Sequence, residues 1–295
     1  MSGIIIIDKS KGYSSFSVVA KIRKILNIKK IGHTGTLDPL ATGVLPVCVG
    51  EATKLSDFIM DGDKVYEVTA KLGTRTDTLD ADGVCVDRGI KDPGLVDSVT
   101  VRATISKFIG DIYQIPPMFS AIKKDGVPLY KLARKGQQIE REKRKITISE
   151  IKILEIAPPY LRLRIFCSKG TYIRTLIDDI GVELGTFAHV TELRRIKNGL
   201  FDINSAIIIN EQTTYDELVS KIIPIEKIVK LIFPCVDVDY NTANKIANGY
   251  VLDLGLQDLG AVFSKDKNGI EKVVSINRAS KTLRVFNYDE WKGTC

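Results

Sequence analysis

The sequence lacks the features that identify membrane and secreted proteins. It contains no run of about eighteen apolar residues, which is the length that a membrane-spanning helix requires. Its first residues carry no basic segment before a short run of four isoleucines, so we expect no signal peptide and a cytosolic protein. The hydrophobic share of 44% and the charged share of 27% are ordinary for a soluble globular protein.

Histidine and cysteine are too few and too scattered for a metal centre or a disulfide framework. There are two histidines, His33 and His189, and five cysteines that include no C-x-x-C pair. Zinc sites need clustered ligands, and disulfide scaffolds need closely spaced paired cysteines. The sequence therefore predicts neither kind of site. Its 295 residues suit one large domain followed by a smaller one.

Acidic residues are scarce in two stretches, and the net charge of +7 is concentrated there. Residues 121–145 hold nine basic and three acidic residues, while residues 21–30 hold five basic residues and no acid. Clustered positive charge is typical of surfaces that bind nucleic acid, although a basic face that only contacts solvent also fits. A positive insertion at 121–145 would suit a flap that closes over a polyanion.

Residues 32–43, GHTGTLDPLATG, combine turn-forming residues with a histidine and a carboxylate. Asp38 precedes Pro39, and a residue before proline is biased towards extended backbone, so we expect Asp38 on a loop. A carboxylate displayed on a constrained loop can act as a nucleophile or a general base. The composition also fits an ordinary turn, and the phosphate-binding pattern G-x-x-x-x-G-K-[ST] is absent.

Hydrophobic periodicity predicts both strands and helices along the chain. The strand expected at 44–49 contains Pro46, which predicts an edge strand or a bulge. Beyond about residue 231 the pattern changes to short strands and glycine-rich turns, with eight basic and eight acidic residues. We expect a small neutral β-rich module there. The other expected strands are 4–7, 65–72, 146–156, 161–167 and 189–196, and expected helices include those at 51–60, 101–109 and 214–223.

Two polar segments leave their roles open. Residues 76–83, TDTLDADG, look like a calcium loop, but Gly89 stands where the twelfth ligand should be, so we predict an acidic turn. Arg174 falls in the first turn of a helix that is expected to end at Gly185. The helix dipole disfavours a cation in that turn. We therefore expect a specific anionic partner for Arg174, although a surface ion pair would also fit.

Six short blocks follow one another over about the first two-thirds of the chain. Their shared order and spacing are far more specific than any single block. Together they resemble the bacterial tRNA pseudouridine-55 synthase family. The blocks are Asp8-Lys9 with Gly12 and Ser14-Ser15, GHTGTLDPLATG at 32–43, KVY at 64–66, RTDTLDADG at 75–83, QIPPMFSA at 114–121 and SKGTYIR at 168–174.

The resemblance implies an α+β fold with a mixed, mainly antiparallel central sheet flanked by helices and loops. It implies a catalytic domain at 1–228, with an RNA-gripping insertion at about 121–145, and a PUA-like RNA-binding module at 229–295. The C-terminal part resembles that module only in size and place. Because this part has no net charge, the resemblance leaves its contact with tRNA undecided.

The resemblance also implies a reaction, the isomerisation of the uridine at position 55 in the T-arm loop of tRNA to pseudouridine. The uracil is detached from its ribose, rotated and rejoined through carbon. Asp38 matches the catalytic aspartate, and Arg174 matches the arginine expected to pair with it. An adjacent guanidinium favours the ionised carboxylate that must attack. Attack on the base ring and attack on the anomeric carbon both fit.

Other matched residues are assigned by the resemblance to the substrate. The buried target base has to be flipped out of the RNA, at a cost of about a few kcal/mol. Tyr66 matches the tyrosine that stacks on the flipped base, and His33 matches the histidine that fills the vacated space. Tyr172 and Leu193 match residues that line the base pocket, while Lys9 is expected to be structural.

The resemblance implies an enzyme that needs no metal or organic cofactor. It further implies a monomer that acts on tRNA without a guide RNA, an obligate protein partner or a membrane. The alternative is an RNA-binding or tRNA-folding protein of the same fold without turnover. The intact set of Asp38, Tyr66 and Arg174 favours catalysis. A guide-RNA-dependent relative would need terminal extensions, and almost none precedes Ile4.

Overall fold

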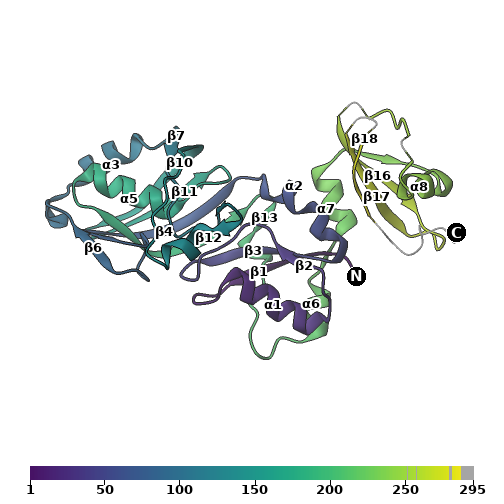
Figure 1. Ribbon diagram of the computed structural model, residues 1–295, viewed down its shortest axis with the longest axis horizontal. Helices are drawn as coiled ribbons and strands as arrows, with labels where there is room; N and C mark the ends of the chain where they lie inside the picture. The colour runs from purple at the N-terminus through teal and green to yellow at the C-terminus, as the bar shows by residue number, and fades with distance from the viewer. Residues whose placement is uncertain (251, 257, 279–280, 287–295) are drawn as a thin grey trace.

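The computed structural model describes residues 1–295 except 251, 257, 279–280 and 287–295 (Figure 1). No described helix has the length and apolarity needed to cross a bilayer. The helices are α1 (Ser15–Leu26), α2 (Ser56–Met60), α3 (Ser98–Ser106), α4 (Leu129–Ala133), α5 (Ile173–Leu184), α6 (Tyr215–Ser220), α7 (Ile225–Ile232) and α8 (Tyr240–Ala247). Short 3-10 helices are η1 (Gly50–Leu55), η2 (Pro93–Leu95) and η3 (Ile203–Ser205).

Most strands belong to one ten-stranded sheet of order β14-β1-β3-β12-β4-β11-β10-β7, with β2 paired to β3 and β13 paired to β12. All its pairs are antiparallel except β3 with β12, so the expected mixed, mainly antiparallel sheet is confirmed. Its strands are β1 (Gly3–Lys9), β2 (Ile31–His33), β3 (Thr42–Val49), β4 (Lys64–Leu72), β7 (Gly110–Gln114), β10 (Arg144–Ala157), β11 (Tyr160–Cys167), β12 (Ala188–Asn198), β13 (Phe201–Asp202) and β14 (Ile223–Pro224).

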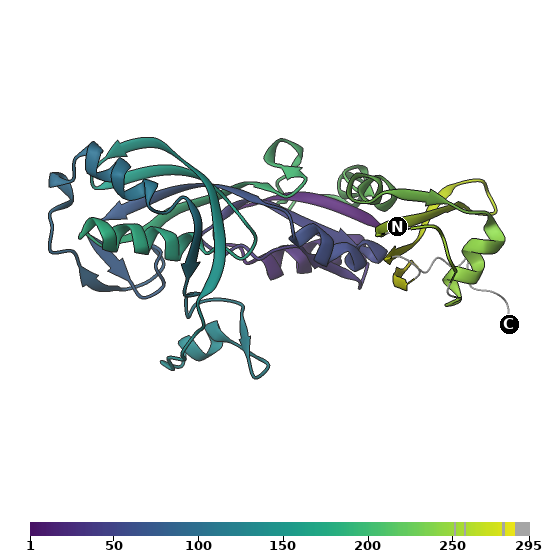
Figure 2. The same ribbon diagram turned by 90° about the horizontal axis from the view of Figure 1, so that it is seen from above.

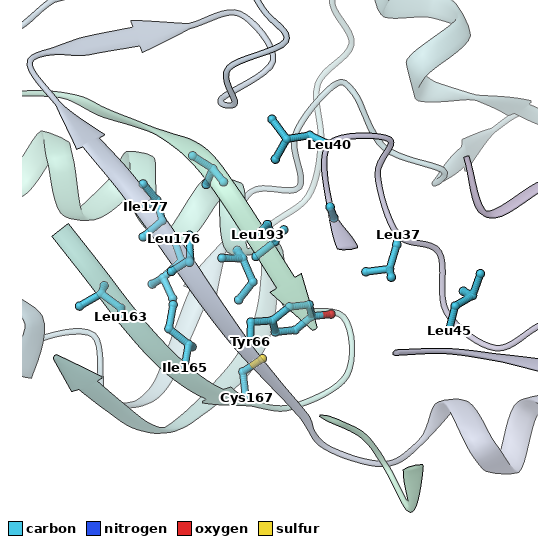
Figure 3. Close-up of a cluster of buried hydrophobic side chains, with 14 of the residues drawn as sticks. Leu37, Leu40, Leu45, Tyr66, Leu163, Ile165, Cys167, Leu176, Ile177 and Leu193 are labelled. Carbon is cyan, nitrogen blue, oxygen red and sulfur yellow. The ribbon is translucent and has the colours of Figure 1, made fainter. Parts of the chain in front are cut away.

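The N-terminal half of this sheet is buried on both faces. In β1, Ile5 and Ile7 belong to one hydrophobic core, whereas Ile4 and Ile6 belong to another. This explains why β1 has four consecutive isoleucines instead of an alternating pattern. The first core continues under α1 and α5, and Figure 3 shows a group of its side chains around Tyr66.

The prediction that Pro46 marks an edge strand is wrong. Strand β3 lies inside the sheet, between β1 and β12. It pairs with β12 at Thr42 and Gly43 and with β2 from Val47 to Val49. Pro46 falls between these two pairings, where β3 changes neighbours, so its missing N–H costs no ladder hydrogen bond.

Local sequence signals account for the main helix ends. Ser14 caps α1 by accepting a hydrogen bond from the amide of Ser17. Gly185 ends α5 in the left-handed conformation, with φ 75°, as expected for that glycine. The helix expected at 51–60 is divided into η1 and α2, and the helix expected at 101–109 is α3.

Two small hairpins extend from the sheet. One pairs β5 (Thr74–Thr76) with β6 (Cys85–Arg88). The other pairs β8 (Lys123–Lys124) with β9 (Val127–Pro128) and belongs, with α4, to the basic insertion. Figure 2 shows this insertion in teal, projecting away from the sheet. We call residues 121–145 the basic flap.

The C-terminal module is a four-stranded sheet of order β15-β16-β17-β18, with α8 packed against it. Its strands are β15 (Cys235–Asp237), β16 (Leu259–Lys265), β17 (Glu271–Arg278) and β18 (Lys281–Val285). Phe263 and Ile276 share a core with Ile4 and Ile6 of β1 and with Ile228 of α7, and the module lies beyond α7 at one end of the main sheet (Figure 1). The predicted boundary between 228 and 229 falls within α7, and the two-domain division stays a prediction.

The contact between β3 and β12 leaves no room for a side chain at Gly43. This glycine has φ +101°, and an added Cβ would lie 2.1 Å from the carbonyl oxygen of Arg195. Gly12 has a similar φ of +87°, but its added Cβ would meet nothing within 4 Å. Substitution of Gly12 therefore tests the cost of the backbone conformation alone, whereas substitution of Gly43 tests that cost together with the cost of a steric clash.

We predict that Gly43→Ala destabilises the protein much more than Gly12→Ala. The left-handed backbone costs about 1–2 kcal/mol at either position, and overpacking adds about 1–3 kcal/mol at Gly43 only. Urea unfolding of both variants measures the difference. Equal losses of unfolding free energy would contradict the close approach of β3 and β12.

Candidate active site

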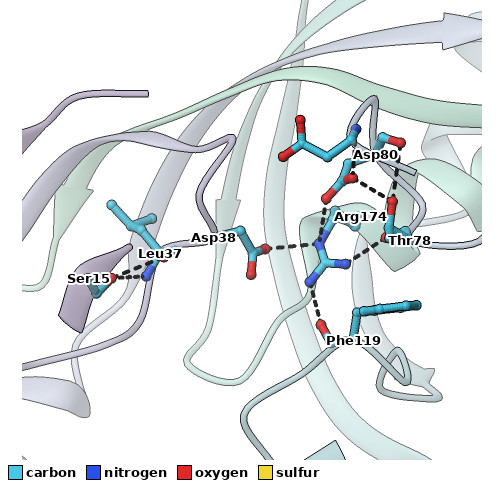
Figure 4. A network of polar contacts seen from close by, with 8 residues as sticks. Ser15, Leu37, Asp38, Thr78, Asp80, Phe119 and Arg174 are labelled. Atoms are coloured by element: carbon cyan, nitrogen blue, oxygen red, sulfur yellow. Dashed lines mark hydrogen bonds and ion pairs between the residues drawn. The ribbon is translucent and has the colours of Figure 1, made fainter. Parts of the chain in front are cut away.

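Asp38 lies on a loop whose apolar residues hold it in place. Leu37, Leu40 and Ala41 are buried, and the Ser15 hydroxyl accepts a hydrogen bond from the amide of Leu37 (2.8 Å) while donating to its carbonyl (3.0 Å). Figure 4 shows this clamp beside Asp38. The Asp38 side chain keeps 38% of its surface exposed. The loop thus presents one carboxylate on a fixed backbone.

Arg174 is the anchor of this carboxylate. It is the second residue of α5 and its side chain is 5% exposed. Its Nε donates to Asp38 Oδ2 at 2.9 Å, while Nη1 donates to the Thr78 carbonyl (2.6 Å) and Nη2 to the Phe119 carbonyl (2.7 Å) (Figure 4). The expectation of a specific anionic partner for Arg174 is confirmed.

Asp80 is a second carboxylate at the same guanidinium, and the sequence interpretation missed it. Its Oδ2 lies 3.7 Å from the Arg174 Nε. Burial raises the pKa of Asp80, whereas the hydrogen bond from Thr78 and the charge of Arg174 lower it. The segment was interpreted only as an acidic turn. The only sequence signal for Asp80 was its place in the RTDTLDADG block at 75–83. That signal is weak, because it does not indicate which of the acidic residues is buried.

A cavity of about 740 Å³ opens beside Asp38. Five of the six predicted site residues line it together: Asp38, Tyr66, Tyr172, Arg174 and Leu193. Tyr66 and Leu193 come from the adjacent strands β4 and β12 and lie side by side in Figure 3. Burial raises the pKa of both tyrosines, so their phenols are protonated at neutral pH.

His33 is the sixth predicted residue, and it is not among the described residues that line this cavity. It is the last residue of β2, directly before the loop that carries Asp38, and its Nδ1 is buried without a hydrogen-bond partner. Burial and the charge of Arg195 lower the pKa of His33, so the ring is neutral at pH 7. A neutral ring suits insertion between bases rather than pairing with phosphate.

Cations surround the mouth and the floor of the cavity. Arg144 and Lys145 of the basic flap line it, as do Lys64, Lys169 and Arg195. Lys9 lies deeper and donates to the carbonyls of Tyr13 (2.7 Å), Ser10 (3.1 Å) and Pro39 (3.4 Å). Burial lowers the pKa of Lys9 to about 8, which leaves it mostly protonated at neutral pH. Lys9 thus ties the segment before α1 to the Asp38 loop. These contacts agree with the structural role expected for Lys9.

The chemistry open to this site follows from its groups. A carboxylate held by a guanidinium beside an apolar, tyrosine-lined cavity can act as a nucleophile or a base on a flat, uncharged ring. The cationic rim favours a substrate that carries negative charge outside the cavity. In the part of the chain that the structure describes, no three His, Cys, Asp or Glu side chains are grouped so that they could hold a metal ion.

Two family models match consecutive parts of the chain. Residues 23–173 match the N-terminal domain of the TruB family pseudouridylate synthases, and residues 174–230 match the C-terminal domain of tRNA pseudouridylate synthase B. The first match contains the Asp38 loop, and the boundary between the two lies just before Arg174. The first model thus covers the described lining of the cavity except Arg174, Leu193 and Arg195, which fall in the second model.

Curated relatives and solved structures agree with these matches. The tRNA pseudouridine synthase B of Stutzerimonas stutzeri (strain A1501) is 50% identical over 207 residues, which cover 70% of this chain and 67% of the relative. That of Burkholderia pseudomallei (strain 668) is 43% identical over 256 residues, covering 86% and 83%.

The fold is also similar to that of a chain in a crystal structure of a Cbf5-Nop10-Gar1 complex. The TM-score is 0.70 at 26% identity, and the alignment covers 99% of this chain and 87% of that one. A second similar chain, from an H/ACA RNP bound to a substrate RNA containing 2′-deoxyuridine, has a TM-score of 0.69 at 25% identity and covers 98% and 86%. The sequence and the fold agree, and the chain belongs to the TruB family of pseudouridylate synthases.

Proposed function

We propose that this protein isomerises the uridine at position 55 in the T-arm loop of tRNA to pseudouridine. The observation that carries the proposal is the 2.9 Å contact between Arg174 Nε and Asp38 Oδ2 at the edge of the cavity. Membership of the family supports the reaction type. The proposed roles of the individual residues rest on the geometry of the site and on their match to the family motifs.

Asp38 is the proposed nucleophile. Its carboxylate forms a bond either to the anomeric carbon or to the uracil ring, and the bond between N1 and the ribose breaks. The uracil rotates, its C5 joins the ribose, and the bond to Asp38 breaks, which regenerates the carboxylate. The C5 proton is lost and N1 gains one, so no atom is added or removed overall. Arg174 stabilises the ionised carboxylate before attack and keeps it aimed into the cavity.

The cavity is the proposed pocket of the flipped base. Its volume of about 740 Å³ exceeds a single uracil, which leaves space for the ribose and for rotation of the base. Tyr66 is placed to stack on the ring, and Tyr172 and Leu193 are placed to line the pocket. His33, outside the cavity on the β2 end, is placed to fill the space that the base vacates in the RNA.

The basic flap is the proposed grip on the RNA backbone. It carries nine basic and three acidic residues, and Arg144 and Lys145 extend this charge to the cavity rim. Lysine and arginine that neutralise phosphates release counterions, so binding through the flap is strongly salt-dependent. We propose that tRNA binds the flap and the cavity of the main sheet. No contact with tRNA is assigned to the neutral C-terminal module.

We further propose a monomer in the cytoplasm that needs neither a guide RNA nor a protein partner. The similar chain of the Cbf5-Nop10-Gar1 complex is found with two other proteins, so this proposal distinguishes the present chain from that assembly. The competing function is a tRNA-folding protein without turnover. The paired Asp38 and Arg174 support catalysis over that alternative, because binding RNA does not require a carboxylate held by a buried guanidinium at the edge of a cavity.

We predict that Asp38→Asn abolishes pseudouridine formation on an unmodified tRNA transcript. The amide cannot attack, so the single-turnover rate falls by at least roughly 10⁴-fold, the scale expected when an essential group is removed. The affinity for tRNA stays within a few-fold, because Asp38 makes no contact with phosphate in the proposal. Chemical mapping of pseudouridine and a filter-binding titration measure the two quantities.

The matched control is Asp216→Asn on α6, which removes a carboxylate far from the cavity and leaves the rate unchanged. A parallel loss of binding and turnover in Asp38→Asn would assign Asp38 a structural role. Product formed by Asp38→Asn at the normal rate would reject the nucleophile.

We also predict that replacing Lys123 and Lys124 with glutamine weakens tRNA binding and flattens its salt dependence. Both side chains are exposed on β8 of the flap. Each lost phosphate contact lowers the slope of log K against log salt by about 0.7–0.9. The exposed pair Lys221 and Lys227 serves as the control, and its replacement leaves the slope unchanged. Identical slopes for the two double variants would place the RNA grip elsewhere.

A further inference from the structure

A second buried guanidinium lies beneath the Asp38 loop. Arg195 on β12 is 1% exposed and is the first among the largest fully buried side chains. Arg174 forms ion pairs with Asp38 and Asp80, whereas Arg195 forms no ion pair within the part of the chain that the structure describes. A buried cation without a carboxylate partner carries a desolvation cost. Its retention in the core points to a function for the groups that it holds.

The guanidinium holds both ends of the Asp38 loop. Its Nη2 donates to the carbonyl of Gly35 at 3.0 Å, and its Nε donates to the carbonyl of Val44 at 2.7 Å. Gly35 precedes Asp38 by three residues, and Val44 follows it by six. Asn198, on the same strand, adds a hydrogen bond to the Thr34 carbonyl at 3.0 Å. One strand therefore fixes the loop at its entry and at its exit.

The same guanidinium reaches Tyr66. In the antiparallel pair of β12 and β4, Arg195 stands directly opposite Tyr66. Both line the cavity with Asp38. The charge of Arg195 and its hydrogen bond with Tyr66 lower the tyrosine pKa against the larger effect of burial, which raises it. Arg195 thus holds the backbone of the Asp38 loop and stands opposite Tyr66.

Close backbone packing fixes the position of this guanidinium. Arg195 pairs with Gly43 across β12 and β3, where an added Cβ would lie 2.1 Å from the Arg195 carbonyl oxygen. A Cβ at Gly35 would lie 3.5 Å from Nη1, so the loop rests directly on the guanidinium. The glycines of the loop therefore also serve its contact with Arg195.

We propose that Arg195 is a positioning residue for the isomerisation, because its single planar guanidinium sets the Asp38 loop and the Tyr66 hydroxyl at a fixed separation. This inference rests on the proposed function of the cavity. Arginine presents five N–H donors in one plane, and lysine offers a point charge that cannot span the three acceptors. The charge alone is therefore insufficient for the role.

The test compares Arg195→Lys with Arg194→Lys in the full-length protein. Arg194 is the next residue on β12, faces the other side of the sheet and pairs with Asp8 at 2.6 Å. We expect Arg195→Lys to lower the single-turnover rate on tRNA transcript by roughly 10²-fold, the loss associated with a misplacement of about 1 Å. The tRNA dissociation constant stays within about threefold, and Arg194→Lys changes neither quantity by more than about threefold.

Hydrogen exchange provides a readout that does not depend on turnover. In Arg195→Lys, amides of residues 35–44 exchange faster, while those of the basic flap are unchanged; Arg194→Lys leaves both segments unchanged. Arg195→Met is the second variant, because it removes the desolvation cost of the buried charge and keeps a long side chain in the core. It is expected to lose at least as much rate as Arg195→Lys.

Each outcome decides the proposal. A normal rate in Arg195→Lys or Arg195→Met, or unchanged exchange at 35–44, overturns it. A loss of tRNA affinity equal to the loss of rate also overturns it, since that is the signature of a general structural defect. If the wild-type protein forms no pseudouridine, the proposed function fails and the catalytic role of Arg195 fails with it, while hydrogen exchange still tells whether Arg195 holds the loop.

Discussion

The site depends on the contact between the buried Arg174 and the partly exposed Asp38. The guanidinium of Arg174 also donates to the carbonyls of Thr78 and Phe119, so one side chain of α5 joins three segments that are far apart in the sequence. Asp80 supplies a second negative charge at the same group. Charge-assisted hydrogen bonds of this kind are shorter and stronger than bonds between neutral groups. The position of the Asp38 carboxylate is therefore set by where α5 begins.

Buried cations held by backbone carbonyls give the surroundings of Asp38 a positive field. Lys9 donates to Pro39, Lys64 donates to Met60 and Gly62, and Arg195 donates to Gly35 and Val44. Because carbonyls do not neutralise these charges, the field favours negative charge in the cavity and polyanions at its rim. Lys9 and Arg195 thereby tie the backbone of the Asp38 loop to β1 and β12. Electrostatics and positioning thus come from the same side chains.

The sequence predicted those parts of the site that obey local rules. Asp38 before Pro39 implied a loop, and a cation in the first turn of α5 implied an anionic partner; both hold in the structure. The roles of Asp80 and Arg195 could not be predicted, because their burial depends on β12 lying between β3 and β4. Pro46 was misplaced at an edge for the same reason. The missing information is the order of strands, which hydrophobic periodicity does not contain.

The most direct test of the account is the single-turnover rate of Arg174→Lys, measured together with tRNA affinity. Lysine keeps the positive charge beside Asp38 but cannot also hold the carbonyls of Thr78 and Phe119. The account predicts a rate lower by roughly 10²-fold or more, with affinity for tRNA nearly unchanged. A normal rate in Arg174→Lys would show that charge alone suffices and would contradict the account.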